Sequence, residues 1–284
     1  MSSESKTFDG LSFLEKLRSL VLLQQAMLNE ALLLASHGSI QRGGLSIACT
    51  LPEKSRKASA MLAMTAGQSL NAVLEFAGKE GIPVRDCYPI ARSIVESFIN
   101  AAYIVSSTDD VAERALRHVQ FGAWYYSNRR FGTGAYEIDI SSSPDKEKEL
   151  LVRFSEFAKS KSWTSLSVPD RIHKVGVLNS NKAAARLTAA YGLIYYLSSE
   201  VIHGSLFGAS YFYTGYLDEA KSEDSFLEGT KRQIEEILVG VLHAGCGYLA
   251  AFYSCQKIDV LVKEEQRLFD LVLEASTDEA KQEA

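Results

Sequence analysis

The sequence has few residues that interrupt regular structure or bind metals. Its 284 residues include only five prolines and four cysteines. The cysteines form no C-x-x-C pair and have no histidine at zinc-ligand spacing; they are Cys49, Cys87, Cys246 and Cys255. We therefore expect free thiols in a reducing compartment, with neither a metal site nor a cofactor.

A secretory signal and a strong charge of one sign are also lacking. The N-terminal MSSESKTFDG is polar and has no basic stretch followed by an apolar core, which favours a cytoplasmic protein. The chain has 30 Lys plus Arg against 35 Asp plus Glu, a formal net charge of −5. This mild acidity disfavours a protein that covers nucleic acid with its whole surface, but it leaves a local basic patch open.

One segment, 237–256, contains no Asp, Glu, Lys or Arg and is about as long as a bilayer span. Small residues fall on one face of the helix that it would form: Gly240, Ala244, Gly247, Ala251 and Ser254. Such a face suits two membrane helices or the central helix of a bundle. Its polar residues favour the bundle, and we expect no membrane contact.

Apolar residues that recur every three or four positions predict an all-α protein. We expect about eight or nine helices in one bundle domain over residues 1–275, followed by a frayed acidic tail at 276–284. The predicted helices are 10–36, 52–78, 86–106, 109–130, 144–160, 168–176, 181–203, 224–256 and 258–275. Residues 37–50 and 131–143 are predicted to be mobile loops.

Three sequence patterns are typical of helix starts. Thr50 and Glu53 form a potential capping box, in which each side chain accepts the backbone amide of the other residue. Ser143-Pro144-Asp145 places a cap residue before a proline at the first helical position. Ser167 to Asp170 follows the same pattern with the proline one place later. We expect helices to begin at all three.

The first candidate site is a polar stripe on an otherwise apolar helix. Arg92 and Glu96 lie one turn apart, and Asn100 and Tyr103 continue the stripe. The pair forms either a solvated seam or part of the bundle interior, where each charge would require the other because an unpaired buried charge costs several kcal/mol. The sequence leaves both options open.

The second candidate site lies near the end of a later helix. Tyr195, Ser199 and His203 fall on one face at successive turns, and Gly204 ends the helix. A histidine in a last turn has a simple explanation in the helix dipole. If this face meets the Arg92 stripe inside the bundle, His203 instead becomes a candidate acid or base.

A weaker set of bases and aromatics lies in the predicted helix 109–130. It consists of Arg114, Arg117, His118, Trp124, Tyr125, Tyr126, Arg129 and Arg130. Such a mixture occurs in grooves that bind single-stranded RNA or DNA. The residues scatter around the helix, however, which favours a solvated face combined with core aromatics.

The order of the motifs resembles a bacterial domain-of-unknown-function family, number 5677. The resemblance rests on ARSIVESFINAAYI, on Trp163 with SVPDRIHKVG, and on Tyr191 with YYLSSEVIHGS, and it covers roughly residues 60 to 215. It implies an all-helical bacterial protein whose polar positions include Arg92, Glu96 and His203.

The chain is also loosely similar to HEPN proteins, helical bundles that include metal-independent ribonuclease toxins. Their signature places an arginine a few residues before a histidine on one helix. The five residues before His203 include no arginine. Arg92, on another helix, would have to supply the positive charge.

Two hypotheses about function follow. The first is a helical module of bacterial stress or defence that binds a ligand or a protein partner, with a homo-oligomer expected. Tyr195, Ser199, Tyr103 and Asn100 are then the ligand-binding candidates. The alternative is a metal-independent, HEPN-like ribonuclease, in which His203 is the acid or base and Arg92, oriented by Glu96, stabilises phosphate charge.

Overall fold

The computed structural model describes residues 8, 10–79, 81, 83–142, 145–214 and 222–282. Its elements are α1 (Phe13–His37), β1 (Ser39–Arg42), β2 (Leu45–Ala48), α2 (Glu53–Phe76), α3 (Val84–Ser106), α4 (Asp109–Tyr126), β3 (Arg130–Thr133), β4 (Tyr136–Asp139), α5 (Lys146–Arg153), a 3-10 turn η2 (Ser155–Phe157), α6 (Val168–Leu178), α7 (Asn181–Ile202), α8 (Leu206–Thr214), α9 (Glu223–Cys255) and α10 (Asp259–Gln282). The predicted all-α class is confirmed.

Helix α9 lies at the centre of the bundle and packs against α1, α3, α7 and α10. Its small residues allow this close approach. A Cβ atom on Gly240 would lie 2.5 Å from Cγ1 of Ile194, and one on Gly247 would lie 2.7 Å from Cγ of Leu187. Both contacts are with α7, so the predicted small-residue face is used inside the chain.

Within the described residues, two helices are long and apolar enough to span a membrane by length and composition, α1 and α9. In α9 the apolar window is 83% buried inside the protein. Burial in the core therefore accounts for the absence of charge in 237–256.

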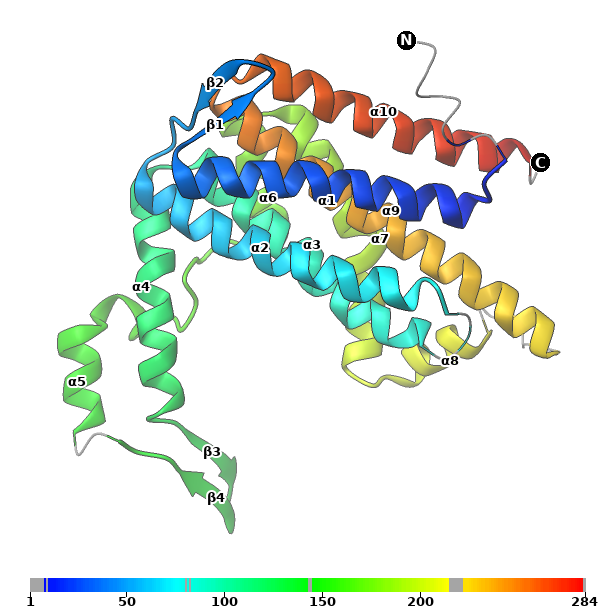
Figure 1. The fold of residues 1–284 in the computed structure, drawn as a ribbon. Helices are drawn as coiled ribbons and strands as arrows, with labels where there is room; N and C mark the ends of the chain where they lie inside the picture. The colour runs from blue at the N-terminus through cyan, green and yellow to red at the C-terminus, as the bar shows by residue number, and fades with distance from the viewer. Residues whose placement is uncertain are drawn as a thin grey trace.

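A second region projects from the bundle (Figure 1). Helix α4 leads away from the other helices, the hairpin β3–β4 lies at its far end, and α5 runs beside it. We call residues 117–161 the arm and the remaining described residues the body. The arm has a small core of its own, made by Phe121, Phe154 and Phe157, which is separate from the large core of the body.

Both segments predicted as mobile loops contain antiparallel hairpins. In 37–50, β1 pairs with β2 across a two-residue turn at Gly43 and Gly44, which have φ of 55° and 79°. Positive φ at both positions is the requirement of a tight hairpin turn. In 131–143, the two-residue turn between β3 and β4 begins at Gly134. The prediction of loops therefore missed these short strands, whereas the mobility of the two segments stays a prediction.

The three predicted helix starts have different outcomes. Ser167 caps α6 as predicted, and together with Asp170 it forms a capping box. The predicted role of Thr50 is wrong, since α2 begins after Pro52 without a side-chain cap and the Thr50 amide instead donates to Oε1 of Gln256 at 3.1 Å. Ser143 and Pro144 lie outside the described residues, and Asp145 itself caps α5.

Several helix boundaries differ from the prediction. Helix α10 continues to Gln282, beyond the predicted end at 275. Helix α4 ends at Tyr126. The predicted helix 144–160 is divided into α5 and η2. Helix α8 was not predicted at all. Gly208, in its first turn, allows it to fold back on the end of α7, because a Cβ there would lie 2.6 Å from the Glu200 carbonyl.

Candidate functional site

The predicted stripe on α3 lies at a half-buried seam. Arg92 Nε donates to Oε1 of Glu96 at 3.3 Å, and the two side chains are 18% and 36% exposed. The seam therefore lies between the two options that the sequence left open: the pair is neither fully solvated nor enclosed. Helices α6 and α7 pack beside α3 here.

Helix α7 contributes an aromatic surface to this seam. The Arg92 guanidinium lies 4.1 Å from the ring centroid of Tyr195, which stacks on Tyr191 at 4.5 Å. Arg92 is therefore held by a carboxylate on one side and a ring on the other. Its Nη1 is buried and has no hydrogen-bond acceptor among the described residues.

Helix α6 contributes a second guanidinium, from Arg171. Arg171 Nη1 donates to Oδ1 of Asn100, and its guanidinium lies 6.0 Å from the ring of Trp163. The Trp163 ring also contacts Tyr103, with centroids 6.0 Å apart. Two predicted residues of α3, Asn100 and Tyr103, thus lie in the same seam as Arg92.

Burial sets the electrostatics of the seam. It lowers the pKa of Arg171, and the nearby Glu96 carboxylate opposes this shift. Burial also raises the pKa of Tyr191, with a further contribution from Tyr195. Among the described residues, the charges recorded as interacting here are the guanidiniums of Arg92 and Arg171 and the carboxylate of Glu96. We call Arg92, Glu96, Asn100, Arg171 and Tyr195 the arginine cluster.

The other predicted residues of α7 lie further from Arg92. Ser199 is half-buried, and its carbonyl accepts the amide of His203 at 3.0 Å. His203 is exposed and forms the C-terminal cap of α7. His203 lies eight residues after Tyr195, the residue whose ring contacts Arg92. Eight residues span about 12 Å along a helix axis. The structure therefore brings Arg92 to Tyr195 but not to His203.

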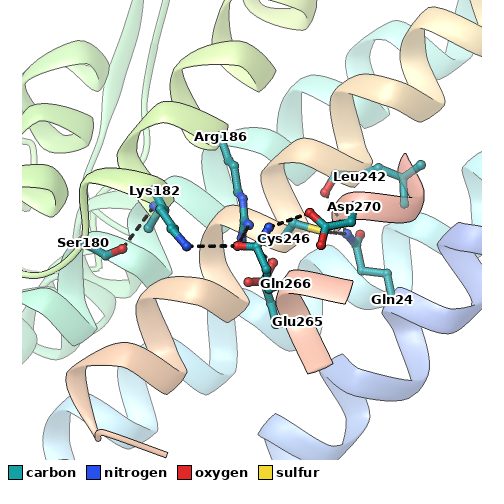
Figure 2. Close-up of polar contacts among 10 residues, drawn as sticks. Gln24, Ser180, Lys182, Arg186, Leu242, Cys246, Glu265, Gln266 and Asp270 are labelled. Carbon is teal, nitrogen blue, oxygen red and sulfur yellow. Dashed lines mark hydrogen bonds and ion pairs between the residues drawn. The ribbon is translucent and has the colours of Figure 1, made fainter. Parts of the chain in front are cut away.

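A second polar network, which the sequence analysis missed, lies inside the body (Figure 2). Arg186 of α7 forms an ion pair with Glu265 of α10, and the two side chains are 4% and 2% exposed. Arg186 Nη2 also donates to Oε1 of Gln266 at 3.0 Å, and its guanidinium lies 3.9 Å from the ring of Phe269.

This network links four helices. Gln24 of α1 donates from Nε2 to the carbonyl of Leu242, at 2.7 Å, and to Sγ of Cys246, at 3.2 Å. Burial raises the pKa of Glu265, against the opposing effect of Arg186. Because the pair is enclosed, we assign it a structural role in joining α7 to α10. The available signal in the sequence was Arg186 itself, a charge within the alanine-rich stretch 183–190.

The bases of α4 are mostly engaged within the arm and its attachment to the body. Arg114 Nε donates to the carbonyl of Trp163 at 2.8 Å. Arg117 pairs with Glu156 at 2.6 Å. A ring nitrogen of His118 lies 2.8 Å from the carbonyl of Lys161. These contacts hold the segment after α5 against α4.

The four cysteines are free, with Cys87 and Cys246 buried and the other two half-buried. Burial raises the pKa of all four thiols, for Cys87 and Cys255 to about 12. They are therefore poor nucleophiles. The described residues contain no group of three His, Cys, Asp or Glu side chains arranged to hold a metal ion.

Comparison with known proteins gives one match. A search of curated proteins and a search of solved structures found nothing similar to the chain. A family model matches residues 59–223, which contain the whole arginine cluster and the arm. Glu265 and Gln24 of the buried network lie outside the match. The match covers more than half of the sequence, and the chain therefore belongs to the Family of unknown function (DUF5677).

Proposed function

We propose that the protein is a helical binding module and that its ligand is a small anion held at the arginine cluster. The observation that carries this proposal is the charge balance of the seam, where Glu96 is the one carboxylate among the described residues that is recorded as acting on both Arg92 and Arg171. The surplus positive charge is half-buried, where it attracts an anion more strongly than in open solvent.

The donors and rings of the cluster suit a particular chemistry. Guanidinium groups recognise carboxylate and phosphate oxygens in a bidentate manner. Nη1 of Arg92 is buried and finds no acceptor in the described part of the chain, and an unmet buried donor costs about 1–3 kcal/mol. An anion that accepts from this nitrogen recovers that free energy. The neighbouring Tyr195 and Trp163 rings favour a planar group attached to the anion.

Ligand titration tests this proposal with inorganic phosphate, adenosine monophosphate and adenosine as probes. We expect the two phosphates to bind and adenosine to fail. Arg92→Gln and Arg171→Gln should each weaken phosphate binding by about 10-fold or more, since a hydrogen bond to a charged group contributes about 1.5–3 kcal/mol.

The matched control is Arg232→Gln, which removes an exposed arginine that pairs with Glu228 on α9. It should bind as the wild type does. Circular dichroism establishes that each variant is folded. Failure of both phosphates to bind the wild type, or unchanged binding by folded Arg92→Gln, contradicts the proposal.

The alternative, a HEPN-like ribonuclease, requires Arg92 and His203 to act on one phosphate. The position of His203 at the exposed end of α7 disfavours it. An RNA cleavage assay separates the two ideas, because a ribonuclease loses about 10²-fold or more in rate with either His203→Ala or Arg92→Ala. The bacterial stress or defence setting stays a prediction from the resemblance.

A further inference from the structure

The hairpin of the arm has two chemically different faces. Its register pairs Phe131 with Ile138 and Thr133 with Tyr136 on one face. On the other face it pairs Arg130 with Asp139 and Gly132 with Glu137, because side chains alternate along a strand. One face is therefore apolar and the other is charged.

The charged face is satisfied within the arm, whereas the apolar face is not covered. Arg130 forms an ion pair with Glu137, and Lys146 donates to Asp139 at 2.8 Å. All eight residues of the two strands are exposed. A two-stranded hairpin is only marginally stable in water unless another element packs against it.

The apolar face continues onto the end of α4. The Arg129 guanidinium lies 5.0 Å from the ring of Tyr126 and 5.5 Å from that of Phe131. The Arg129 carbonyl accepts the amide of Ile140 at 2.9 Å. The arm patch consists of five large, exposed side chains. Their exposed fractions are 64% for Tyr126, 45% for Phe131, 87% for Tyr136, 54% for Ile138 and 39% for Ile140.

The size and charge of the arm patch indicate a second copy of the chain as its occupant. Taking roughly 200 Å² for a fully exposed side chain of this kind, the patch presents on the order of 600 Å². Two copies would bury about 1,200 Å², the lower limit of a standard specific interface. Among the described residues, Arg129 is the cation that lies against rings of the patch, whereas a phosphate backbone or an anionic membrane requires a row of cations.

We propose that the protein forms a two-fold dimer in which two arm patches pack face to face. Pairing through the outer edges of two β4 strands is disfavoured. It would place Glu137 opposite Glu137 or Asp139 of the second copy, and like charges in such positions are destabilising. Face-to-face packing places Phe131 and Ile138 against the same apolar side chains of the second copy.

Sedimentation velocity on the full chain over a range of concentrations tests the proposal. We expect a wild-type dimer. Ile138→Asp and Tyr136→Lys should each weaken dimerisation by about 30-fold or more, the effect of losing a central interface residue. Tyr136 is almost fully exposed in one copy, so its substitution leaves the fold of the chain intact.

The matched control is Val152→Asp, at an exposed apolar residue of α5 outside the arm patch. It should dimerise as the wild type does. A wild type that is monomeric at about 100 μM overturns the proposal, as does a dimer that persists unchanged in Tyr136→Lys or one that only Val152→Asp disrupts.

Discussion

The body and the arm are stabilised by different means. In the body, helices surround α9 at short distances, and the Arg186–Glu265 ion pair is sealed from solvent. In the arm, three phenylalanines make a small core, and the ion pairs lie at the surface. Apolar burial is the main driving force of folding, so the body should hold most of the free energy of unfolding.

The two proposals, anion binding and dimerisation, concern these two different regions. The arginine cluster lies on α3, α6 and α7, which the body holds in place, whereas the arm patch lies on a hairpin with little support of its own. Sites that need fixed geometry benefit from rigid elements. A weakly supported hairpin can instead gain its stability from a partner.

The largest expected difference concerns ion pairs. Glu265→Ala leaves the Arg186 guanidinium buried and unpaired, which should lower the free energy of unfolding by about 3–5 kcal/mol. Glu137→Ala removes the ion-pair partner of Arg130 in the arm, and it should leave the free energy of unfolding unchanged within error. Urea denaturation measures both.

The double variant Arg186→Met with Glu265→Leu sharpens this test. It should recover much of the loss, because apolar side chains can replace a buried pair without leaving a charge. Equal effects of Glu265→Ala and Glu137→Ala would remove the distinction between the two regions.

The next effect concerns glycines in helices. Gly247→Ala in α9 pushes a methyl group against Leu187, and such overpacking costs about 1–3 kcal/mol. Gly122→Ala in α4 meets no atom within 4 Å, so it should stabilise the helix by up to about 1 kcal/mol. Thermal and urea unfolding of the two variants should shift in opposite directions. Stabilisation by Gly247→Ala would contradict the close contact of α9 and α7.

The smallest effect is a pH dependence of opposite sign in the two regions. The pKa of Glu265 in the body is raised by burial, so its contribution to stability is full below pH 4.5 and falls as the pH rises toward the raised pKa. A hydrogen bond from Arg117 lowers the pKa of Glu156 in the arm. That contribution is present above pH 4.5 and is lost as the pH falls through the lowered pKa.

Acid should therefore loosen the arm before the body. Trp124 lies in the arm, and with Trp163→Phe it becomes the single tryptophan of the chain. Its fluorescence should change at a higher pH than the far-ultraviolet circular dichroism of the bundle as acid is added. Coincident transitions would show that the arm and the body unfold together.

The sequence predicted the helices better than it predicted their contacts. Apolar periodicity and the Ser167 cap depend on residues that are close together in the chain, so both can be recognised in a single sequence. The partners of Arg92 come from α6 and α7, and nothing local indicates that Arg171 faces the same seam as Asn100. His203 was a candidate because it shares a helical face with Tyr195. The eight residues between them, however, place His203 about 12 Å further along the helix axis, away from the ring that contacts Arg92.

Apart from its first residue, the central helix α9 lies outside the part of the chain that the family model matches. Similarity ends at residue 223, where this helix begins, although α3 and α7 both pack against it. A protein truncated at that point would expose Leu187 and Ile194 to water. A fragment of this chain limited to residues 59–223 would therefore lack the helix that completes the packing of α3 and α7.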